Sequence, residues 1–245
     1  MGHCLMMRKG EVHTAPVTGV LASSLAVGST VKLMEGGTAV EYLVVNQGIP
    51  ENSSLYDASC DGTWLLRKDC YDTHNWNNRA SNVYQTSSVN TFLNTDFLSL
   101  LGENQQAIIK EVKIPYTVGA GSSSIMGGEQ GLPVKVFLLC SEEIGMAAVS
   151  TIPADGAKLS YFESGTSQSA KNKRIATYNG SAINCWIRSP HTGGSITDMR
   201  LAWYITTSGI LNSANVTNSY GIRPALILPS NALFDKTTMI LKGVK

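Results

Sequence analysis

The chain has 245 residues, of which 43% are hydrophobic and 15% charged, enough apolar material for one generous core. Nineteen Lys and Arg residues against eighteen Asp and Glu residues give a formal charge of +1. The protein therefore has no strong net electrostatic field that would favour binding to nucleic acid, an acidic membrane or an acidic substrate. The composition also argues against extended disorder. We expect a folded domain that selects its partners through local contacts.

The first residues do not have the pattern of a targeting or membrane segment. Arg8 and Lys9 follow the first apolar patch, and Pro16, Gly19 and Gly28 interrupt the next one, which argues against a secretory signal. No window approaches the roughly 20 apolar residues of a membrane span. We expect a protein made without a signal peptide, either cytoplasmic or associated with a virion, and with no membrane span.

The chain divides into an arm and one domain. Residues 1–28 are rich in Gly, Ser, Thr and Ala, and we interpret them as an arm or lead-in through which the chain forms a homo-oligomer. Residues 29–245 form the domain. Its first element is a β-hairpin, because two β-prone runs, 31–34 and 39–45, flank a Gly-Gly turn.

A short apolar strand follows at 63–67, and the polar stretch 71–85 is typical of a loop. The spacing of apolar residues between 87 and 110 predicts helix. Ser88 is the expected N-cap. Gly102 is expected to end the first helix and separate it from a second.

The middle of the chain is predicted to be mainly irregular. A strand at 111–116 is placed near an end or an edge by Pro115, and 119–131 is a Gly/Ser-rich loop. The apolar run 134–139 predicts a central strand covered on both faces. The stretch 145–173, rich in small residues, predicts a long insertion over the surface.

The last 70 residues are β-rich. We predict strands at 183–188, 201–206 and 220–228, with a turn at 207–209. Together with two or three short helices in the middle of the chain, this predicts an α+β fold with a β-rich C-terminal half.

Cysteine and histidine spacing favours neither a metal site nor a disulfide framework. Five cysteines are an odd number, no C-x-x-C pair occurs, and the four histidines are scattered. We expect free, buried thiols, although a bridge between Cys60 and Cys70 remains open. No catalytic residue, metal ligand or cofactor is predicted. The cysteines are Cys4, Cys60, Cys70, Cys140 and Cys185.

Four local motifs occur in order along the chain: Trp64-Leu65-Leu66-Arg67, Phe92-Leu93-Asn94, Trp186-Ile187-Arg188-Ser189-Pro190 and Gly221-Ile222-Arg223-Pro224-Ala225. Over residues 29–235 the chain resembles a family of bacterial and phage domains of unknown function with the C-type-lectin-like fold. That family is related to the formylglycine-generating enzymes. The resemblance implies a C-type-lectin-like fold for this chain.

Several such domains resemble the variable proteins of diversity-generating retroelements, in which the end of the lectin fold displays variable positions. The stretch 191–218 has the mixture of Asn, Ser, Thr, Tyr and Ile that this resemblance implies, although a polar β-hairpin would have a similar composition. The implied ligand-binding residues are Asn184, His191, Thr192, Ser195, Thr197, Asp198, Arg200, Tyr204, Thr206, Ile210, Asn212, Ser213, Asn215 and Thr217.

A second group of residues is predicted to hold the fold. Arg188 and Arg223 lie in apolar strands, so each needs a hydrogen-bonded or charged partner if it is buried. Of Trp203 and Tyr204, one is expected to point inward and the other outward. The predicted structural residues are Trp64, Trp186, Arg188, Trp203, Gly221 and Arg223.

These observations predict a non-enzymatic, receptor-recognition protein that binds a protein or glycan ligand on a cell or phage surface. One alternative is a phage or cell-surface assembly protein. A second is a calcium-assisted carbohydrate-binding lectin, although Trp76-Asn77-Asn78 lies in the wrong part of the chain and Asp72 and Asp198 are isolated. The third is an oxidase that requires Cys185, for which no partner cysteine is evident in the sequence.

Overall fold

The computed structural model describes residues 18–51 and 54–245. Most of the predicted arm, residues 1–17, lies outside the described residues, and so does Cys4. The division at residue 28 stays a prediction. Residues 18–28 contact the domain, because Val20 and Leu21 pair with Phe234 and Leu233, and Ala22 is buried.

The first of two five-stranded sheets has the order β10-β17-β4-β3-β2. The predicted hairpin is confirmed: β2 and β3 pair antiparallel, and Gly36 and Gly37 turn with φ angles of 54° and 88°, which glycine adopts without strain. The strands are β2 (Thr30–Glu35), β3 (Thr38–Gln47), β4 (Thr63–Arg67), β10 (Val136–Phe137) and β17 (Ala225–Leu228).

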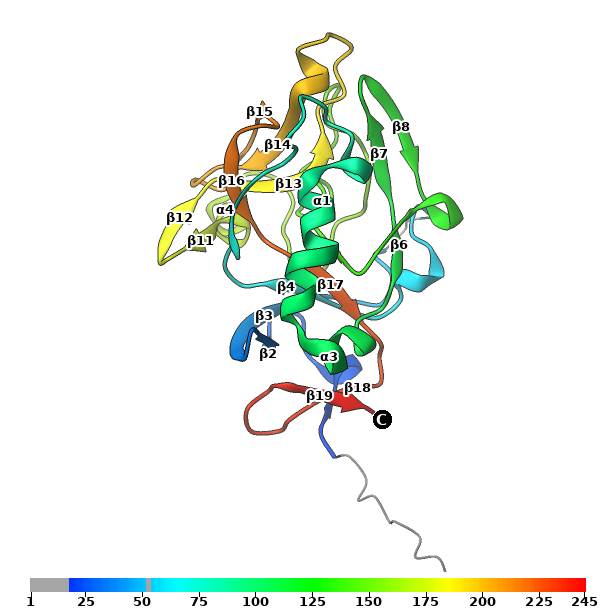
Figure 1. The fold of residues 1–245 in the computed structure, drawn as a ribbon, viewed down its shortest axis with the longest axis vertical. Coiled ribbons are helices and arrows are strands. Elements are labelled where there is room, and N and C mark those ends of the chain that lie inside the picture. Colours follow the sequence, from blue (N-terminus) through cyan, green and yellow to red (C-terminus); the bar gives the residue numbers. More distant parts are fainter. Residues whose placement is uncertain (1–17, 52–53) are drawn as a thin grey trace, which may run out of the picture.

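The second sheet, which we name the C-terminal sheet, has the order β15-β14-β13-β16-β5. Only β13 and β16 run parallel; the other neighbours are antiparallel. This sheet occupies the half of the molecule away from β2 and β3 (Figure 1). Its strands are β5 (Asp72–Asn75), β13 (Cys185–Pro190), β14 (Leu201–Ile205), β15 (Leu211–Asn215) and β16 (Ser219–Ile222).

The prediction of a single strand at 220–228 is wrong. β16 ends at Ile222 and β17 begins at Ala225, and the two strands belong to different sheets. Pro224 has no N–H for a ladder, which explains the interruption. Its carbonyl accepts from the N–H of Arg67 at 2.9 Å, and Nε of Arg223 donates to the Arg67 carbonyl at 2.8 Å. The residues between β16 and β17 thus join the two sheets.

Helices between residues 88 and 108 cover one side of the molecule (Figure 1). The predicted break at Gly102 is confirmed, since its φ is 60°. The predicted N-cap Ser88 is wrong by one residue: Ser87 accepts from Asn90 N. The helices are α1 (Ser88–Phe92), a π-helical turn (Leu93–Phe97), α2 (Leu98–Leu100), α3 (Gly102–Ile108) and α4 (Gln168–Arg174). Short 3-10 turns are Ala22–Ser24, Ala58–Cys60, Tyr84–Thr86, Gly128–Gln130 and Asp198–Arg200.

Small strands complete the α+β fold, and some occupy stretches predicted to be loops. The predicted loop 71–85 contains β5, and 119–131 contains β8 (Ser122–Met126), which pairs with β7 (Tyr116–Gly119). The predicted central strand 134–139 is wrong: Val134 ends β9 (Leu132–Val134), and only Val136–Phe137 pair in the first sheet, as the edge strand β10, although these residues are buried. The remaining strands are β1 (Val20–Leu21), β6 (Val112–Ile114), β11 (Ala176–Tyr178), β12 (Ser181–Ile183), β18 (Ala232–Phe234) and β19 (Leu241–Val244).

A buried ion pair ties β13 to the segment 140–158. Both nitrogens at the fork of Arg188 contact the carboxylate of Glu143 at 2.6 Å, and neither side chain is exposed. Arg188 also donates to the carbonyls of Pro115 (3.1 Å) and Leu138 (2.9 Å). The predicted need of Arg188 for a partner is thereby met, because a planar guanidinium can engage a carboxylate and carbonyls together.

A second carboxylate, Asp155, lies beside this pair without exposure to solvent. It accepts from the hydroxyls of Ser189 at 3.1 Å and Thr117 at 3.2 Å. Burial raises the pKa of Asp155 from 3.8 to about 6, against the opposing effect of the positive charge of Arg188. The carboxyl therefore takes up its proton near pH 6.

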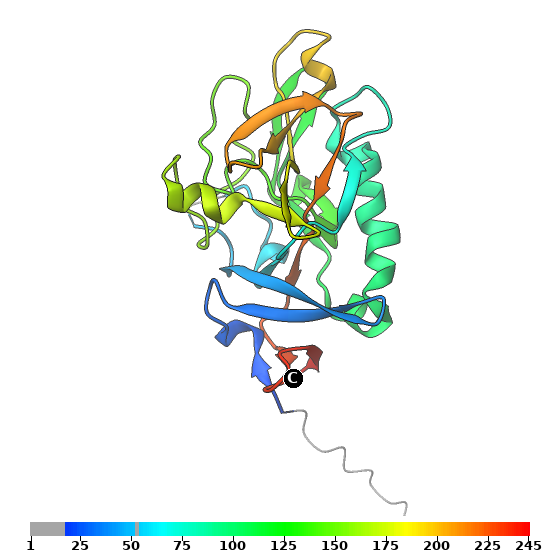
Figure 2. The same cartoon turned by 90° about the vertical axis from the view of Figure 1, so that its left-hand side faces the viewer.

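The β1-β18-β19 sheet and the loop after β13 lie at opposite ends of the molecule (Figures 1 and 2). The sheet lies at the end where the C-terminus emerges.

Within the described part of the chain, we found no helix with the length and apolar character needed to cross a bilayer.

Replacing Asp155 by Asn should remove a pH-dependent contribution to stability. Because the folded state holds this proton more tightly, Asp155 contributes stability at low pH that is lost as the pH rises through about 6. Relative to Asp155→Asn, the natural chain should lose stability between about pH 4 and about pH 6.5. Urea denaturation of both proteins measures the difference, and a difference that is independent of pH would contradict the assignment.

Candidate functional site

The predicted ligand-binding residues lie mainly around two strands, β14 and β15. These pair antiparallel, and β15 forms an edge of the C-terminal sheet. The candidates separate into groups at the two ends of this strand pair. We name the first group the loop end: His191, Thr192, Ser195, Thr197, Asp198, Arg200, Asn215 and Thr217. We name the second group the turn end: Asn184, Thr206 and Ile210.

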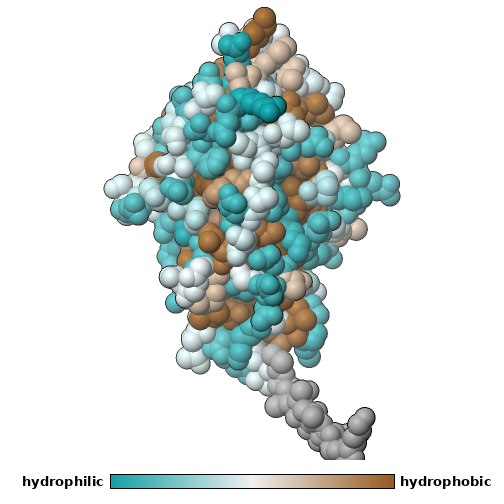
Figure 3. All heavy atoms as spheres, viewed as in Figure 1, coloured by the Kyte–Doolittle hydropathy of each residue, from teal (hydrophilic) through white to brown (hydrophobic). Residues whose placement is uncertain are grey.

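The loop end presents side chains to solvent. Ser195, Thr197 and Arg200 are exposed, and so are Asn215 and Thr217. A hydrophobic side chain accompanies them, since Ile196 is 71% exposed. In Figure 3, hydrophobic atoms project at the tip of this end among hydrophilic and neutral residues. The surface therefore offers both polar and apolar contacts.

The buried side chain of Asn82 holds loop 191–200 in place. Its Nδ2 shares donation among the carbonyls of His191 (2.9 Å), Asp198 (3.1 Å) and Leu201 (2.9 Å). Its Oδ1 accepts from the N–H of Ala120 at 2.7 Å, in the turn between β7 and β8. One side chain thus ties both ends of the loop to a neighbouring hairpin. Nothing in the sequence distinguished this Asn from others in its polar stretch.

Asp198 orders the loop from within. It accepts from the hydroxyl of Ser195 at 2.6 Å and from the Ser195 N–H at 3.1 Å. The hydroxyl bond is the main cause of the lowered pKa of Asp198, and His191 nearby contributes. Because these bonds occupy the carboxylate, Asp198 shapes the loop and leaves Ile196 and Thr197 directed outward.

Trp203 joins the loop to a second segment of the chain. Its ring stacks on His191, with centroids 5.3 Å apart and planes inclined by 17°. Its Nε1 donates to the carbonyl of Thr151 at 3.0 Å, and that carbonyl also accepts from Thr192 N at 3.1 Å. The segment around Thr151 therefore adjoins the loop end. Val149 in this segment is 57% exposed.

A wide hollow of about 620 Å³ lies in this second segment, where the sequence predicted only a surface insertion. Apolar side chains line it next to the carboxylate of Glu142, whose pKa is raised by burial, and the amine of Lys158. Small and polar residues in this stretch carry no periodic pattern, so the sequence offered no signal for the hollow. Its apolar lining includes Met146, Ala147, Val149, Ile152 and Ala157.

The turn end is fixed by hydrogen bonds that its backbone N–H groups donate. Thr206 N donates to Ile210 O at 2.8 Å, and Thr207 N donates to Oδ1 of Asn184 at 3.2 Å. Gly209 turns with a φ of 76°, and an added Cβ would lie 2.4 Å from the carbonyl of Lys171. The turn thus packs closely on α4, and Ile210 remains 40% exposed.

Tyr204 does not share the exposure of its neighbours. It is 7% exposed, and its ring packs 5.8 Å from Trp186 and 4.6 Å from Tyr220. We therefore assign it a packing role in place of the predicted ligand contact. On β15, Asn212 opposite it is exposed, and Ser213 is half-buried.

The predicted structural residues mostly lie in buried surroundings. Trp64 is fully buried, and its Nε1 donates to the carbonyls of Gly48 (3.0 Å) and Cys60 (3.1 Å). Trp186 is 1% exposed and donates to the carbonyl of His74 at 3.0 Å. Trp203 is half-buried, which makes it the more exposed of the Trp203–Tyr204 pair.

The cysteines and candidate metal ligands can also be placed. Cys60 and Cys70 are not bridged, and Cys70 instead lies beside Cys185 with 3.5 Å between the sulfurs. Among residues 18–51 and 54–245, no three His, Cys, Asp or Glu side chains are grouped so as to hold a metal ion. In the Trp76-Asn77-Asn78 motif considered above for calcium, Trp76 is buried, and Nδ2 of Asn77 donates to Ser81 O.

These features define an α+β domain with an exposed polar surface on a rigid sheet. Residues 61–230 match the family model described as a domain of unknown function, DUF6273. The chain therefore belongs to this family. Searches of curated proteins and of solved structures found no significant match.

Replacing Asn82 by Ala should loosen loop 191–200 selectively. The loss removes one donor from three carbonyls and the acceptor of the Ala120 N–H, which should lower the free energy of unfolding by about 1–3 kcal/mol. Hydrogen exchange should accelerate in residues 191–201 more than in β2 and β3. The exposed Asn218→Ala variant is the control and should change stability by less than about 0.5 kcal/mol. Unchanged exchange in the loop would contradict this role of Asn82.

Proposed function

We propose that this chain is a non-enzymatic ligand-binding module whose contact surface comprises the exposed residues of the loop end, of β15 and Ile210. Its ligand is a protein or a glycan on a cell or phage surface. The observation that carries the proposal is the separation between the groups that hold loop 191–200 and the groups that the loop presents. Asn82, Asp198 and Trp203 fix the loop from behind, whereas Thr197 and Arg200 face solvent.

Because of this separation, the exposed side chains can determine which ligand is bound without altering the fold. Exposed side chains on a loop held by a sheet can change while buried groups keep the backbone in place. The mixture of Ile196, Arg200 and small hydroxyl residues supplies apolar area, charge and adaptable hydrogen bonds, a composition related to that of antibody paratopes. Residues 191–200 lie opposite the C-terminus, which favours their access to a partner (Figure 1).

The finer form of the proposal is that the scaffold is C-type-lectin-like and that the surface varies through a diversity-generating retroelement. It is supported by the exposure of Ile210, Asn212 and Asn215, which have the residue types expected for such variation.

We expect the DNA neighbouring the coding sequence to contain a reverse transcriptase gene and a near-copy of the codons for residues 184–225. Sequencing of the genomic neighbourhood checks this expectation. A neighbourhood that lacks both would remove the retroelement proposal and leave the binding proposal intact.

Combined replacement of the exposed residues should abolish binding without unfolding the protein. One variant changes Ile210, Asn212, Asn215 and Thr217 to Ala; a second changes Ile196, Thr197 and Arg200 to Ala. Surface changes of this kind cost about 0.5 kcal/mol or less each, so the melting temperature should stay nearly unchanged. Binding is measured on a glycan array and against a phage-displayed peptide library.

The natural chain should select a reproducible set of glycans or peptides, and the two variants should lose it. A matched control changes the exposed Lys68 and Glu103, which lie outside the surface, and should retain binding. Retained binding by both surface variants, or a large fall in their melting temperatures, would refute the assignment of the surface.

A further inference from the structure

Cys70 and Cys185 form a buried dithiol pair. They are 115 positions apart in sequence, yet their sulfurs are separated by 3.5 Å, and the residues are 3% and 5% exposed. They form a small apolar cluster with Ala176, against which Tyr178 and Ile183 pack. A disulfide needs sulfurs at about 2.0 Å, so the two sulfurs must approach by about 1.5 Å to form one.

The surrounding backbone holds the two cysteines in this position. The N–H of Cys70 donates to Thr177 O at 2.8 Å, and its carbonyl accepts from Nη1 of Arg67 at 2.9 Å. Cys185 lies in β13, where it pairs with Gly221 of β16. Both residues are therefore fixed by neighbours in the fold.

The absence of a side chain at Gly221 provides the space for the pair. A Cβ at this position would lie 2.6 Å from Sγ of Cys70 and 3.2 Å from its Cβ. The φ of Gly221 is not in the left-handed region, so backbone conformation does not require glycine here. The requirement comes from the Cys70 sulfur, which occupies the place of a side chain.

The charges around the pair favour reaction at Cys70. A hydrogen bond with Cys185 lowers the pKa of Cys70, and the nearby cations of Arg223 and Arg67 act in the same direction. In contrast, burial raises the pKa of Cys60 to about 12 and raises that of Cys140 strongly. Among the described cysteines, Cys70 thus has the most favourable surroundings for a thiolate.

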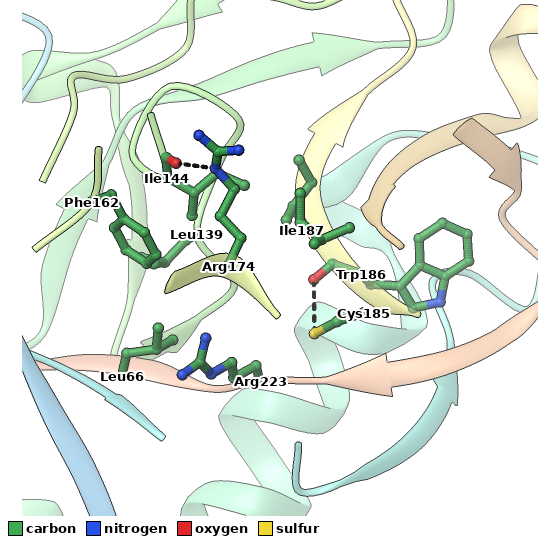
Figure 4. A pocket seen from close by; sticks show the side chains of 10 residues that line it. Leu66, Leu139, Ile144, Phe162, Arg174, Cys185, Trp186, Ile187 and Arg223 are labelled. Carbon is green, nitrogen blue, oxygen red and sulfur yellow. Dashed lines mark hydrogen bonds between the residues drawn. The ribbon is translucent and has the colours of Figure 1, made fainter. Parts of the chain in front are cut away.

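A small cavity reaches Cys185, whose sulfur contacts that of Cys70, although Cys70 does not itself line the cavity. It measures about 30 Å³, and Cys185, Arg223 and Arg174 are among its lining residues. In Figure 4, Cys185 lies between Trp186 and Arg223; the ring of Trp186 is directed away from it, and the guanidinium of Arg223 is directed toward Leu66. A single water needs about 10–15 Å³, so the cavity can hold a molecule with two oxygen atoms.

We infer that Cys70 and Cys185 are a redox modification site that forms a reversible disulfide when the protein meets a hydroperoxide. The thiolate of Cys70 attacks the terminal OH oxygen of the peroxide, and the O–O bond breaks. Hydroxide departs from hydrogen peroxide, or an alkoxide from an organic hydroperoxide, and Cys70 becomes a sulfenic acid. The sulfur of Cys185 then attacks the Cys70 sulfur, the S–O bond breaks, and water leaves with the Cys185 proton. Two electrons pass from the thiols to the peroxide, and a dithiol reductant reverses the change.

The disulfide would join the segment before β5 to β13, within the sheet that carries the loop end. It would close a loop of more than 100 residues, and cross-links over such lengths restrict the unfolded chain strongly. The oxidised protein should therefore melt at a higher temperature than the reduced protein. This inference does not depend on the proposed binding function.

The test uses the full chain with Cys4→Ser, so that the four described cysteines remain. The folded protein is treated with hydrogen peroxide, free thiols are alkylated in denaturant, and peptides are analysed by mass spectrometry without reduction. We expect two of four thiols to be lost, one peptide pair linked through Cys70 and Cys185, and full recovery with dithiothreitol. Four free thiols, or a link through Cys60 or Cys140, would overturn the inference.

Two variants separate the roles of the sulfurs. Cys185→Ser removes the resolving thiol, so the sulfenic acid of Cys70 should persist and be trapped by dimedone. Cys60→Ser, a matched change of another buried cysteine, should leave the disulfide unaffected. Dimedone trapping on Cys60 or Cys140 in place of Cys70 would contradict the order of the steps. The measurement on the chain with all four cysteines remains decisive if either variant fails to fold.

Discussion

The guanidinium of Arg188 carries a positive charge into the interior, and its surroundings are arranged to compensate it. Without partners, burial of such a charge would be prohibitively unfavourable. The carboxylate of Glu143 supplies the counter-charge, and two carbonyls accept from Nε and Nη1. Since Tyr56 and Cys140 also donate to Glu143, the ion pair connects three separate stretches of chain. This geometry sets where the segment 140–158 can lie.

The position of that segment in turn affects the candidate surface. Thr151 belongs to it, and the Thr151 carbonyl is the acceptor for both Trp203 and Thr192. The buried ion pair is thus connected to the exposed loop through the segment 140–158, which contains both Glu143 and Thr151. Asn82 provides a second, independent support from the side of β7 and β8. A surface supported in this way can tolerate varied side chains because its backbone does not depend on them.

Sequence patterns predicted the hairpin at Gly36-Gly37, the break at Gly102 and the α+β class, since each depends on local conformational preference. They also predicted that Arg188 would need a partner. They did not identify Glu143, because its position 45 residues away in an apparently irregular stretch leaves no local signal. β5 and β8 were missed because they are polar edge or hairpin strands whose pairing is decided by tertiary contacts.

The candidate surface was also predictable only in part, because composition is a local property whereas packing depends on tertiary contacts. Composition correctly suggested exposed residues such as Thr197 and Asn212, because solvent-facing loops favour small polar side chains. Composition could not show that Tyr204 packs inward, since its direction depends on the register of β14 against its neighbours. Asn82 and the dithiol pair depend on contacts between residues far apart in the chain, which no single-sequence pattern records.

The sheet β1-β18-β19 has a mechanical consequence. β1 and β19 each pair antiparallel with β18, so they run parallel to each other on its two sides. Val20 lies opposite Phe234, whereas Val244 lies opposite Ala232, at the other end of β18. Tension applied between the two ends of this described domain would therefore shear the strands along their length. The load would fall first on this sheet, while the sheet that carries β14 and β15 would remain outside the direct path of the force.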